Sequence, residues 1–280
     1  MMNFAFLKNR IVSLLNDKKT FGVNEKNILN ILYFKNIARI NQFAPLVLLI
    51  LLPIIYIDFN RVQQHLGESK IGSQIILYTH LVFTAVLIIY WLLLKWLRIQ
   101  KPEAIKSSHI AQTNSFLFFS VFCMAAISFG DVMIGNGVAN YVGTVFLVAI
   151  LFYLPHGITL IIYLTNTGLL VYSISLLGIN SNLVISHMVN LIAFTLIAFA
   201  ASRYLFHIEV KDQKREEEKN RFFSIIAHDL RTPFNSLIGF SDVILDDYDE
   251  MDDVLKKEII ESIHDVSRDT YHLLDNLLKW

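Results

Sequence analysis

The sequence predicts an all-α protein, in which a six-helix transmembrane bundle is followed by a helical hairpin that forms a four-helix bundle with a second copy. Two observations lead to this fold class. Long apolar segments with very few charges fill the middle of the 280-residue chain, whereas Lys, Arg, Asp and Glu gather toward its two ends. Near the C-terminus, apolar residues recur at alternating spacings of three and four, which is typical of helices packed in a bundle.

Composition by itself decides little, because a chain that is 54% hydrophobic is close to an ordinary soluble protein. The formal net charge is zero, so nothing indicates a general attraction for nucleic acid. The single cysteine, Cys123, lies in an apolar run; it allows no disulfide within the chain and is expected to fill the core or face lipid.

Residues 1–42 are predicted to form cytoplasmic amphipathic helices. In the first of these, five apolar residues at helical spacing lie opposite four basic ones: Phe4, Leu7, Ile11, Leu14 and Leu15 against Lys8, Arg10, Lys18 and Lys19. The same basic residues interrupt any secretory signal pattern. Such a helix either lies along an anionic membrane surface or packs on the protein's own cytoplasmic part. A second amphipathic segment, residues 28–40, leads into the membrane.

Residues 43–206 are predicted to form a six-span sensor domain. The apolar segments are about 43–57, 75–97, 115–134, 139–154, 158–177 and 183–206. Several have the roughly 20 residues that cross a bilayer. The first and fourth are short and would need interfacial residues or locally thinner lipid.

The distribution of basic residues predicts that both termini are cytoplasmic. Seven Lys and Arg precede the first segment, four lie at the junction of the second and third, and a dense cluster follows the sixth, whereas the opposite side carries only Arg61 and Lys70.

Four ionisable residues are expected near the external surface within the membrane: His80, His187, Asp131 and Asp58. Their convergence on one outward-facing pocket would suit a divalent metal or a polar ligand. The alternative is that each residue bonds separately to neighbouring helices or reaches water, and the lack of local ligand spacing favours it. A haem between the two histidines is a weaker hypothesis.

Residues 207–221 are strongly charged and contain no Gly or Pro, so they are predicted to continue the sixth segment as a signalling helix or as a solvated spacer. Residues 222–280 follow as two helices with one apolar stripe each. The stripes are Phe223, Ile226, Leu230, Pro233, Leu237, Phe240 and Ile244, and then Ile259, Ile263, Val266, Thr270, Leu273, Leu277 and Trp280. Two such helices bury their stripes well only when paired with another copy, which predicts a homodimer.

His228 is expected on the outward side of the first of these helices, with Asp229 adjacent and Thr232 one turn later. A neutral imidazole can act as a nucleophile, and a neighbouring carboxylate can hold its tautomer and take the ring proton. A His-Asp pair alone is usually only a solvated polar surface.

The whole run resembles the phospho-acceptor box of bacterial sensor histidine kinases. In that box a Phe and a small-apolar segment precede Ala-His-Asp/Glu-Leu-Arg, Thr or Asn, and Pro. The matching residues are Phe223, Ala227, His228, Asp229, Leu230, Arg231, Thr232 and Pro233. The resemblance covers residues 219–280, about a fifth of the chain.

This resemblance implies a bacterial inner-membrane protein in which His228 accepts the ATP γ-phosphate and passes it to an aspartate of a cytoplasmic response regulator. Asp229 would be its acid/base partner, Thr232 would position water in the reverse, phosphatase reaction, and Arg231 and Pro233 would shape the helix. Full-length members use ATP with Mg²⁺ through a further domain whose motifs are not found here. We therefore expect the chain to be a piece of a longer protein that binds no cofactor and is inactive alone.

The alternative is a membrane ligand-binding or transport protein with a cytoplasmic helical dimerisation module. Half-to-half repeats, which are common in transporters, are not found. With so little chain outside the membrane, we expect a small or apolar signal molecule, or a property of the bilayer, as the stimulus. The arrangement is similar to that of sensor kinases that detect lipid-like autoinducers.

Overall fold

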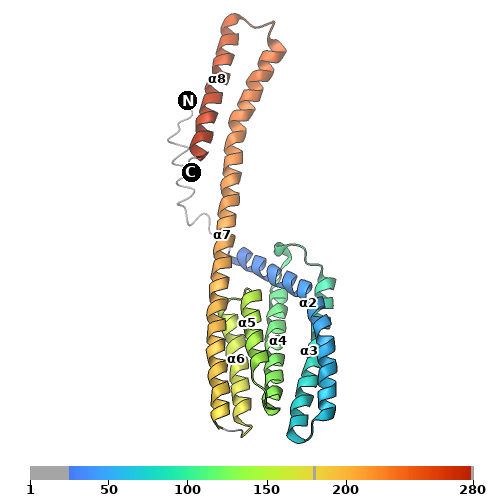
Figure 1. Ribbon diagram of the computed structural model, residues 1–280. Coiled ribbons are helices and arrows are strands. Elements are labelled where there is room, and N and C mark those ends of the chain that lie inside the picture. The colour runs from blue at the N-terminus through green and yellow to red at the C-terminus, as the bar shows by residue number, and fades with distance from the viewer. Residues whose placement is uncertain (1–24, 179–180, 279–280) are drawn as a thin grey trace. The chain divides into compact units, whose positions relative to one another are not determined.

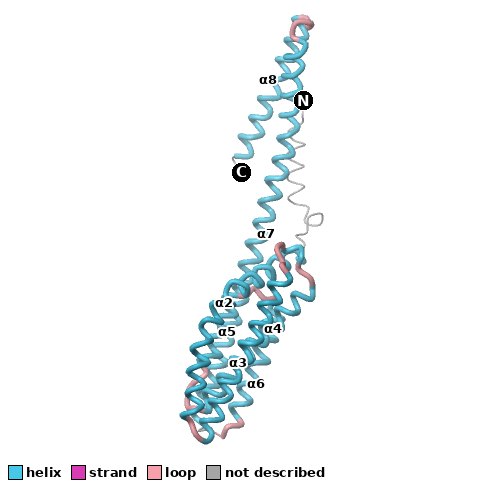
Figure 2. The backbone as a smooth tube through the Cα atoms, turned by 90° about the vertical axis from the view of Figure 1, so that its right-hand side faces the viewer, coloured by secondary structure: helices cyan, strands magenta, loops and turns pink. Residues whose placement is uncertain are grey.

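The computed structural model describes residues 25–178 and 181–278. In these ranges the regular elements are helices joined by short loops, and no strand occurs (Figures 1 and 2). They are α2 (Glu25–Gln64), α3 (Gly67–Leu97), the 3₁₀ turn η1 (Pro102–Ala104), α4 (Ser107–Met133), α5 (Ala139–Leu151), α6 (His156–Ser175), α7 (Ser181–Asp247) and α8 (Asp253–Leu278). The all-α fold class is confirmed. The amphipathic helix expected within residues 4–19 lies outside the described residues.

The chain divides into two compact units, Met1–Gln213 and Lys214–Trp280, and α7 contributes to both. In the first unit, α4 is central: it contacts α3, α5 and α6, and α2 packs against α3 (Figure 1). The core contains Val121, Val145 and Ile174, which are completely buried, and Cys123 is buried with them. Cys123 is therefore a core residue and does not face lipid.

The contact between α3 and α4 is made by backbone at one point. A Cβ added to Gly72 would lie 2.9 Å from the carbonyl oxygen of Gly130, and a Cβ on Gly130 would lie 2.8 Å from that of Gly72. Small residues allow helix backbones to approach closely, which strengthens packing between helices in a bilayer. These two glycines thus set the separation of the two helices.

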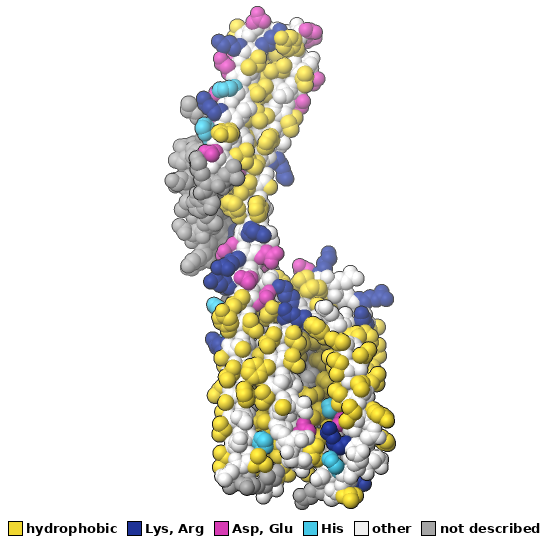
Figure 3. Space-filling view, in the orientation of Figure 1, with side chains coloured by type: hydrophobic (Ala, Val, Ile, Leu, Met, Phe, Trp, Pro, Cys, Tyr) yellow, Lys and Arg dark blue, Asp and Glu magenta, His cyan; other side chains and the backbone are white. Residues whose placement is uncertain are grey.

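The outer faces of the first unit are apolar. Leu49, Ile89 and Leu196 are each more than 60% exposed, and hydrophobic side chains cover the visible surface of these helices (Figure 3). Among the described residues, five helices are long and apolar enough to cross a membrane: α2, α3, α4, α6 and α7. These features fit a membrane protein, because a soluble monomer rarely exposes so large an apolar surface.

The helices differ in length from the expected spans: α3 and α4 begin eight residues before the second and third spans, and the first and fourth spans also differ. The first continues without a break from the preceding amphipathic segment, so that both belong to the 40-residue α2, with Pro45 and Pro53 inside it. Neighbouring helices make such interior prolines tolerable in a bundle. The fourth, α5, has only 13 residues. At 1.5 Å per residue it covers about 20 Å, less than the roughly 30 Å of a hydrocarbon core.

The second unit is a helical hairpin, in which α8 runs back along the second part of α7 (Figures 1 and 2). The carboxylate of Asp252 caps α8 by accepting a 2.7 Å hydrogen bond from the backbone N–H of Leu255. Ile259, Thr270 and Leu273 of the predicted α8 stripe are buried.

The stripe predicted for α7 is half-buried from Ile226 to Ile244, but Phe223 differs, because it is 57% exposed. Phe222 is half-buried in its place. The alternating spacing allows either neighbour, since adjacent residues lie about 100° apart around a helix, and the packing selects Phe222.

Candidate functional site

His228 projects from the second part of α7 into solvent. Its side chain is 77% exposed, and its ring nitrogen Nδ1 lies 3.1 Å from Oδ1 of Asp229. Ile226 and Leu230, on either side of it in the helix, are half-buried in the hairpin. The helical period that turns these two apolar residues inward therefore turns His228 outward, where a large substrate can reach its ring.

The contact with Asp229 determines which ring nitrogen is free to react. An ionised carboxylate can only accept hydrogen bonds, so with Asp229 ionised Nδ1 carries the proton and donates a hydrogen bond to Asp229. The other nitrogen, Nε2, then bears a lone pair. Asp229 is less exposed than the histidine, at 31%, because it lies at the edge of the packed face.

Pro233 belongs to the same site through the backbone. The structure continues α7 through it. Because proline has no N–H, the carbonyl of Asp229, four residues earlier, receives no helical hydrogen bond from it. Thr232 is exposed one turn after His228, and its own carbonyl accepts a bond from Ser236 Oγ at 3.2 Å. Together these residues make an exposed polar face with one nucleophilic nitrogen.

Of the four membrane residues expected in one pocket, two are joined. Asp58 of α2 and His80 of α3 are both buried, with 2.7 Å between Oδ2 of the aspartate and Nδ1 of the histidine. Arg61 adds a second contact, 3.4 Å from the other carboxylate oxygen. This group links α2 to α3.

The other two residues of that set do not share a partner, and of these two Asp131 alone makes side-chain hydrogen bonds in the described ranges. Asp131 accepts hydrogen bonds from the side-chain amides of Asn140 at 2.7 Å and Asn136 at 3.4 Å. The ring of His187 lies about 3.9 Å from the position of a Cβ on Gly137. In the described ranges, neither Asp131 nor His187 bonds to the Asp58–His80 pair, and no three His, Cys, Asp or Glu side chains could hold a metal. Asp131 therefore bonds to its own neighbours, whereas the buried Nε2 of His187 has no hydrogen-bond partner in the described ranges.

A further polar group was not singled out by the sequence. Asn36 of α2 is completely buried, donating to the Tyr153 carbonyl at 3.0 Å and accepting from the Tyr153 N–H at 2.9 Å. Arg39 donates to the Leu151 carbonyl and, at 2.8 Å, to the Tyr153 hydroxyl. The start of α2 therefore packs on the protein itself. The only sequence signal was the presence of Asn and Arg within the apolar stripe of an amphipathic segment.

The same part of α2 holds α7 through an ion pair. Lys35 Nζ lies 2.5 Å from Oε1 of Glu209, which also accepts a 3.1 Å hydrogen bond from Gln213. Burial raises the pKa of Glu209, but the hydrogen bonds from Lys35 and Tyr153 and the lysine charge outweigh it, so that the pKa lies below its ordinary 4.5. Glu209 is therefore ionised at neutral pH.

Comparison with known proteins identifies the hairpin. Residues 218–279 match the His Kinase A (phospho-acceptor) domain. Over 53 residues the chain is 34% identical to an uncharacterized sensor-like histidine kinase of Rhizobium meliloti (strain 1021), a region that is 19% of this chain and 10% of that protein. The chain thus spans about a tenth of the length of this curated relative. No solved structure matches the chain. The predicted resemblance to bacterial sensor histidine kinases is confirmed.

Proposed function

We propose that the chain is the sensor and phosphotransfer part of a membrane histidine kinase in a two-component system, because residues 218–279 match the His Kinase A (phospho-acceptor) domain. In this proposal His228 is phosphorylated from ATP and passes the phosphoryl group to an aspartate of a cytoplasmic response regulator. The observation that carries the proposal is the exposed imidazole whose Nδ1 is held by Asp229, at 3.1 Å, in a segment of this family.

The chemistry follows from the free nitrogen. The lone pair of His228 Nε2 attacks the γ-phosphorus of ATP, the bond from that phosphorus to the bridging oxygen breaks, and ADP leaves. Asp229 stabilises the ring charge that develops and accepts the Nδ1 proton as the phosphoramidate forms. Mg²⁺-ATP is the substrate, delivered by an ATP-binding domain. The aspartate of the regulator then attacks the same phosphorus and displaces the imidazole.

The reverse direction uses Thr232. Its hydroxyl lies one turn from His228 on the exposed side of α7 and can hold a water molecule against the phosphoaspartate of a docked regulator. The protein then removes phosphate from its own regulator when the kinase reaction is off.

We also propose that the first unit is a six-span bundle with both termini in the cytoplasm. Five helices have sufficient length. The short α5 serves as the remaining span with the help of the loop residues at its ends and a thinner bilayer. The basic residues before α2, after α3 and in α7 support this orientation. The hairpin is then on the side of the membrane where ATP is found.

Exposed apolar side chains on the second unit support the proposal of a homodimer. Beside its covered stripe, α7 leaves Phe234, Ile238 and Leu245 between 49% and 78% exposed, and α8 leaves Ile260 56% exposed. A second hairpin packed on these side chains would complete a four-helix bundle and remove them from water.

Phosphotransfer tests the function directly. The 280-residue chain is incubated with Mg²⁺-ATP and a separately supplied histidine kinase ATP-binding domain, and acid-labile phosphate on the chain is measured. The wild type should be labelled and His228→Ala should not. His264→Ala is the matched control, because His264 is also exposed and lies 3.6 Å from the carboxylate of the next residue, Asp265. Equal labelling of His228→Ala and wild type would favour the ligand-binding or transport alternative.

A further inference from the structure

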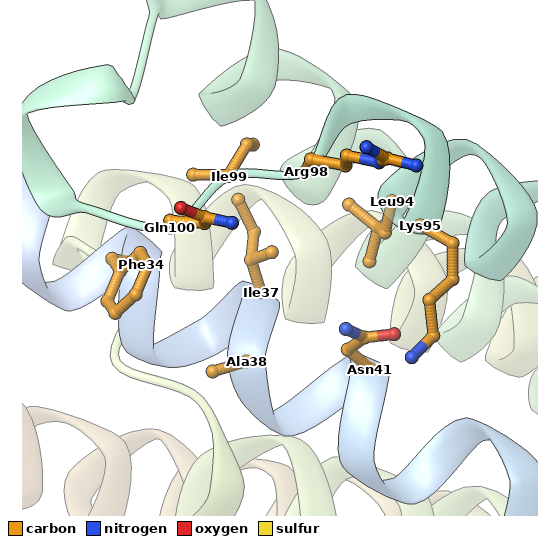
Figure 4. A pocket seen from close by; sticks show the side chains of 9 residues that line it. All are labelled: Phe34, Ile37, Ala38, Asn41, Leu94, Lys95, Arg98, Ile99 and Gln100. Carbon is orange, nitrogen blue, oxygen red and sulfur yellow. The ribbon is translucent and has the colours of Figure 1, made fainter.

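The first unit contains a cavity of about 270 Å³ between α2 and the end of α3. Phe34 and Ile37 of α2 and Leu94 of α3 form an apolar wall, and Lys95 and Arg98 contribute two cations (Figure 4). No Asp or Glu lines it. Within the described ranges, neither of these cations makes an ion pair, although Lys95 lies over the Trp91 ring at 5.8 Å. The cavity therefore combines positive charge with an apolar surface.

Two local features indicate that the cavity is built for a polar ligand. The side-chain oxygen of Asn41, which lines it, is buried and has no hydrogen-bond partner. A buried acceptor without a partner is unfavourable, so a ligand that donates a hydrogen bond would satisfy it. Arg98 has φ 46°, the single positive φ of a non-glycine residue in the described ranges. Glycine would adopt this backbone without strain, so the presence of arginine indicates a use for its guanidinium.

The position of the cavity along α3 indicates the class of ligand. Trp91 and Trp96 occupy the last turns of α3, and Trp96 is 77% exposed. Lys101 and Lys106 follow shortly afterwards. Exposed tryptophan next to basic residues is typical of the level of lipid headgroups. The volume of the cavity, about 270 Å³, is small for a ligand site. It therefore suits the headgroup of a molecule whose acyl chains remain in the bilayer.

We propose that this cavity binds the headgroup of an anionic phospholipid, with Lys95 and Arg98 on the phosphate and Asn41 accepting a hydrogen bond from a headgroup hydroxyl. Phosphatidylglycerol has both groups. Its glycerol backbone and upper acyl chains lie against Phe34, Ile37 and Leu94. The proposal rests on the membrane-spanning part of the proposed function and is independent of phosphotransfer.

Occupancy has a consequence for α2. The helix that lines the cavity also carries Lys35, Asn36 and Arg39, which hold α7 and the segment before α6. A bound headgroup joins α2 to α3 and so stabilises the same end of α2. Lipid composition would thereby affect the stability of the contacts that precede the phosphotransfer helix.

Native mass spectrometry of the 280-residue chain tests the site. Detergent-solubilised protein is titrated with phosphatidylglycerol and, separately, with phosphatidylcholine. We expect bound phosphatidylglycerol, and about thirtyfold weaker binding to the Lys95→Gln/Arg98→Gln variant, because this variant loses both charge-assisted contacts to the phosphate inside the cavity. The control variant Lys101→Gln/Lys106→Gln removes the same charge outside the cavity and should bind nearly as the wild type.

A second variant tests the cavity without changing charge. Ala38 lines it and is exposed, so Ala38→Trp fills the space with little risk to folding, which circular dichroism checks. Ala38→Trp should lose phosphatidylglycerol, together with the rise in melting temperature that the lipid produces in the wild type. Equal losses in the two double variants, unchanged binding to Ala38→Trp, or displacement of the lipid by glycerol phosphate or inorganic phosphate would each overturn the proposal. The last result would indicate a soluble phosphate ligand.

Discussion

Lys35 Nζ and Glu209 Oε1 lie 2.5 Å apart although 174 positions separate them in the sequence. The pair joins the start of α2 to the part of α7 that follows its apolar segment. Glu209 is the more covered partner, with a side-chain exposure of 16% against 39% for Lys35. The contact is therefore a partly buried link between the first helix of the described chain and the helix that continues to His228.

Lys35→Ala should destabilise the first unit at neutral pH by about 1 kcal/mol, the upper part of the range for exposed pairs, because Glu209 is left partly buried without its cation. The pKa of Glu209 is lowered by folding, so the contribution is complete above its ordinary value and is lost as the pH falls through the folded pKa. Melting temperatures of wild type and Lys35→Ala should converge in acid. Lys211→Ala is the control, because Lys211 is an exposed lysine of α7, the helix of Glu209. A loss of stability in Lys35→Ala that does not change with pH would contradict the prediction.

Replacing one partner of the buried Asp58–His80 pair should cost more than replacing both. His80→Leu leaves the carboxylate of Asp58, a residue that is 3% exposed, with Arg61 alone. This change should lower the free energy of unfolding by about 3 kcal/mol. Asp58→Leu/His80→Leu removes both polar groups and should be closer to wild type in thermal unfolding. A double variant as unstable as the sum of the two single variants would show that the residues do not interact.

Asp229→Asn should slow phosphorylation of His228 about a hundredfold while leaving the hairpin folded. The amide neither holds the Nδ1 proton as a carboxylate does nor accepts it during the reaction. The measurement is the initial rate of labelling with a supplied ATP-binding domain. Asp242→Asn, an exposed carboxylate of the same helix, should have no effect; equal slowing by both would assign the loss to general charge.

Gly72→Ala should destabilise the first unit by about 1–3 kcal/mol, because its Cβ would lie 2.9 Å from the Gly130 carbonyl oxygen and would force α3 and α4 apart. A Cβ on Gly168 of α6 would have no atom within 4 Å. Gly168→Ala should therefore raise the free energy of unfolding by about 0.5–1 kcal/mol, because alanine is the better helix former. Thermal unfolding in detergent compares them. Similar effects of both variants would show that the helix crossing tolerates a methyl group.

Ile238→Glu should shift the 280-residue chain from dimer to monomer, because Ile238 is 58% exposed in the single hairpin and would be covered in a four-helix bundle. Light scattering after size-exclusion chromatography measures the mass of the protein. Asn235→Glu adds the same charge to the same turn at a residue that is already polar and should leave the dimer intact. A dimer that survives Ile238→Glu would place the interface elsewhere.

The periodicity of apolar residues in the sequence was sufficient to predict the helices and the exposed position of His228 in the hairpin. Apolar segments and two stripes predicted an all-α chain, and the spacing of Ile226 and Leu230 was enough to place His228 on the outward side of its helix. These are local properties, since residues of one helix share a face whenever their spacing matches its turn. Periodicity did not distinguish Phe222 from Phe223, because two adjacent apolar residues both fit the same stripe.

Only the tertiary structure decided which polar groups of the first unit meet. In the structure Asp58 bonds to His80, and Asp131 bonds to Asn140. The ring of His187 lies near Gly137, and Asn36 bonds to the backbone of Tyr153. The physical reason is that side chains facing lipid and side chains facing the core are both apolar in a membrane bundle. Hydrophobic periodicity therefore identifies each helix without showing how it is rotated against its neighbours, and close packing such as that between Gly72 and Gly130 determines the rotation.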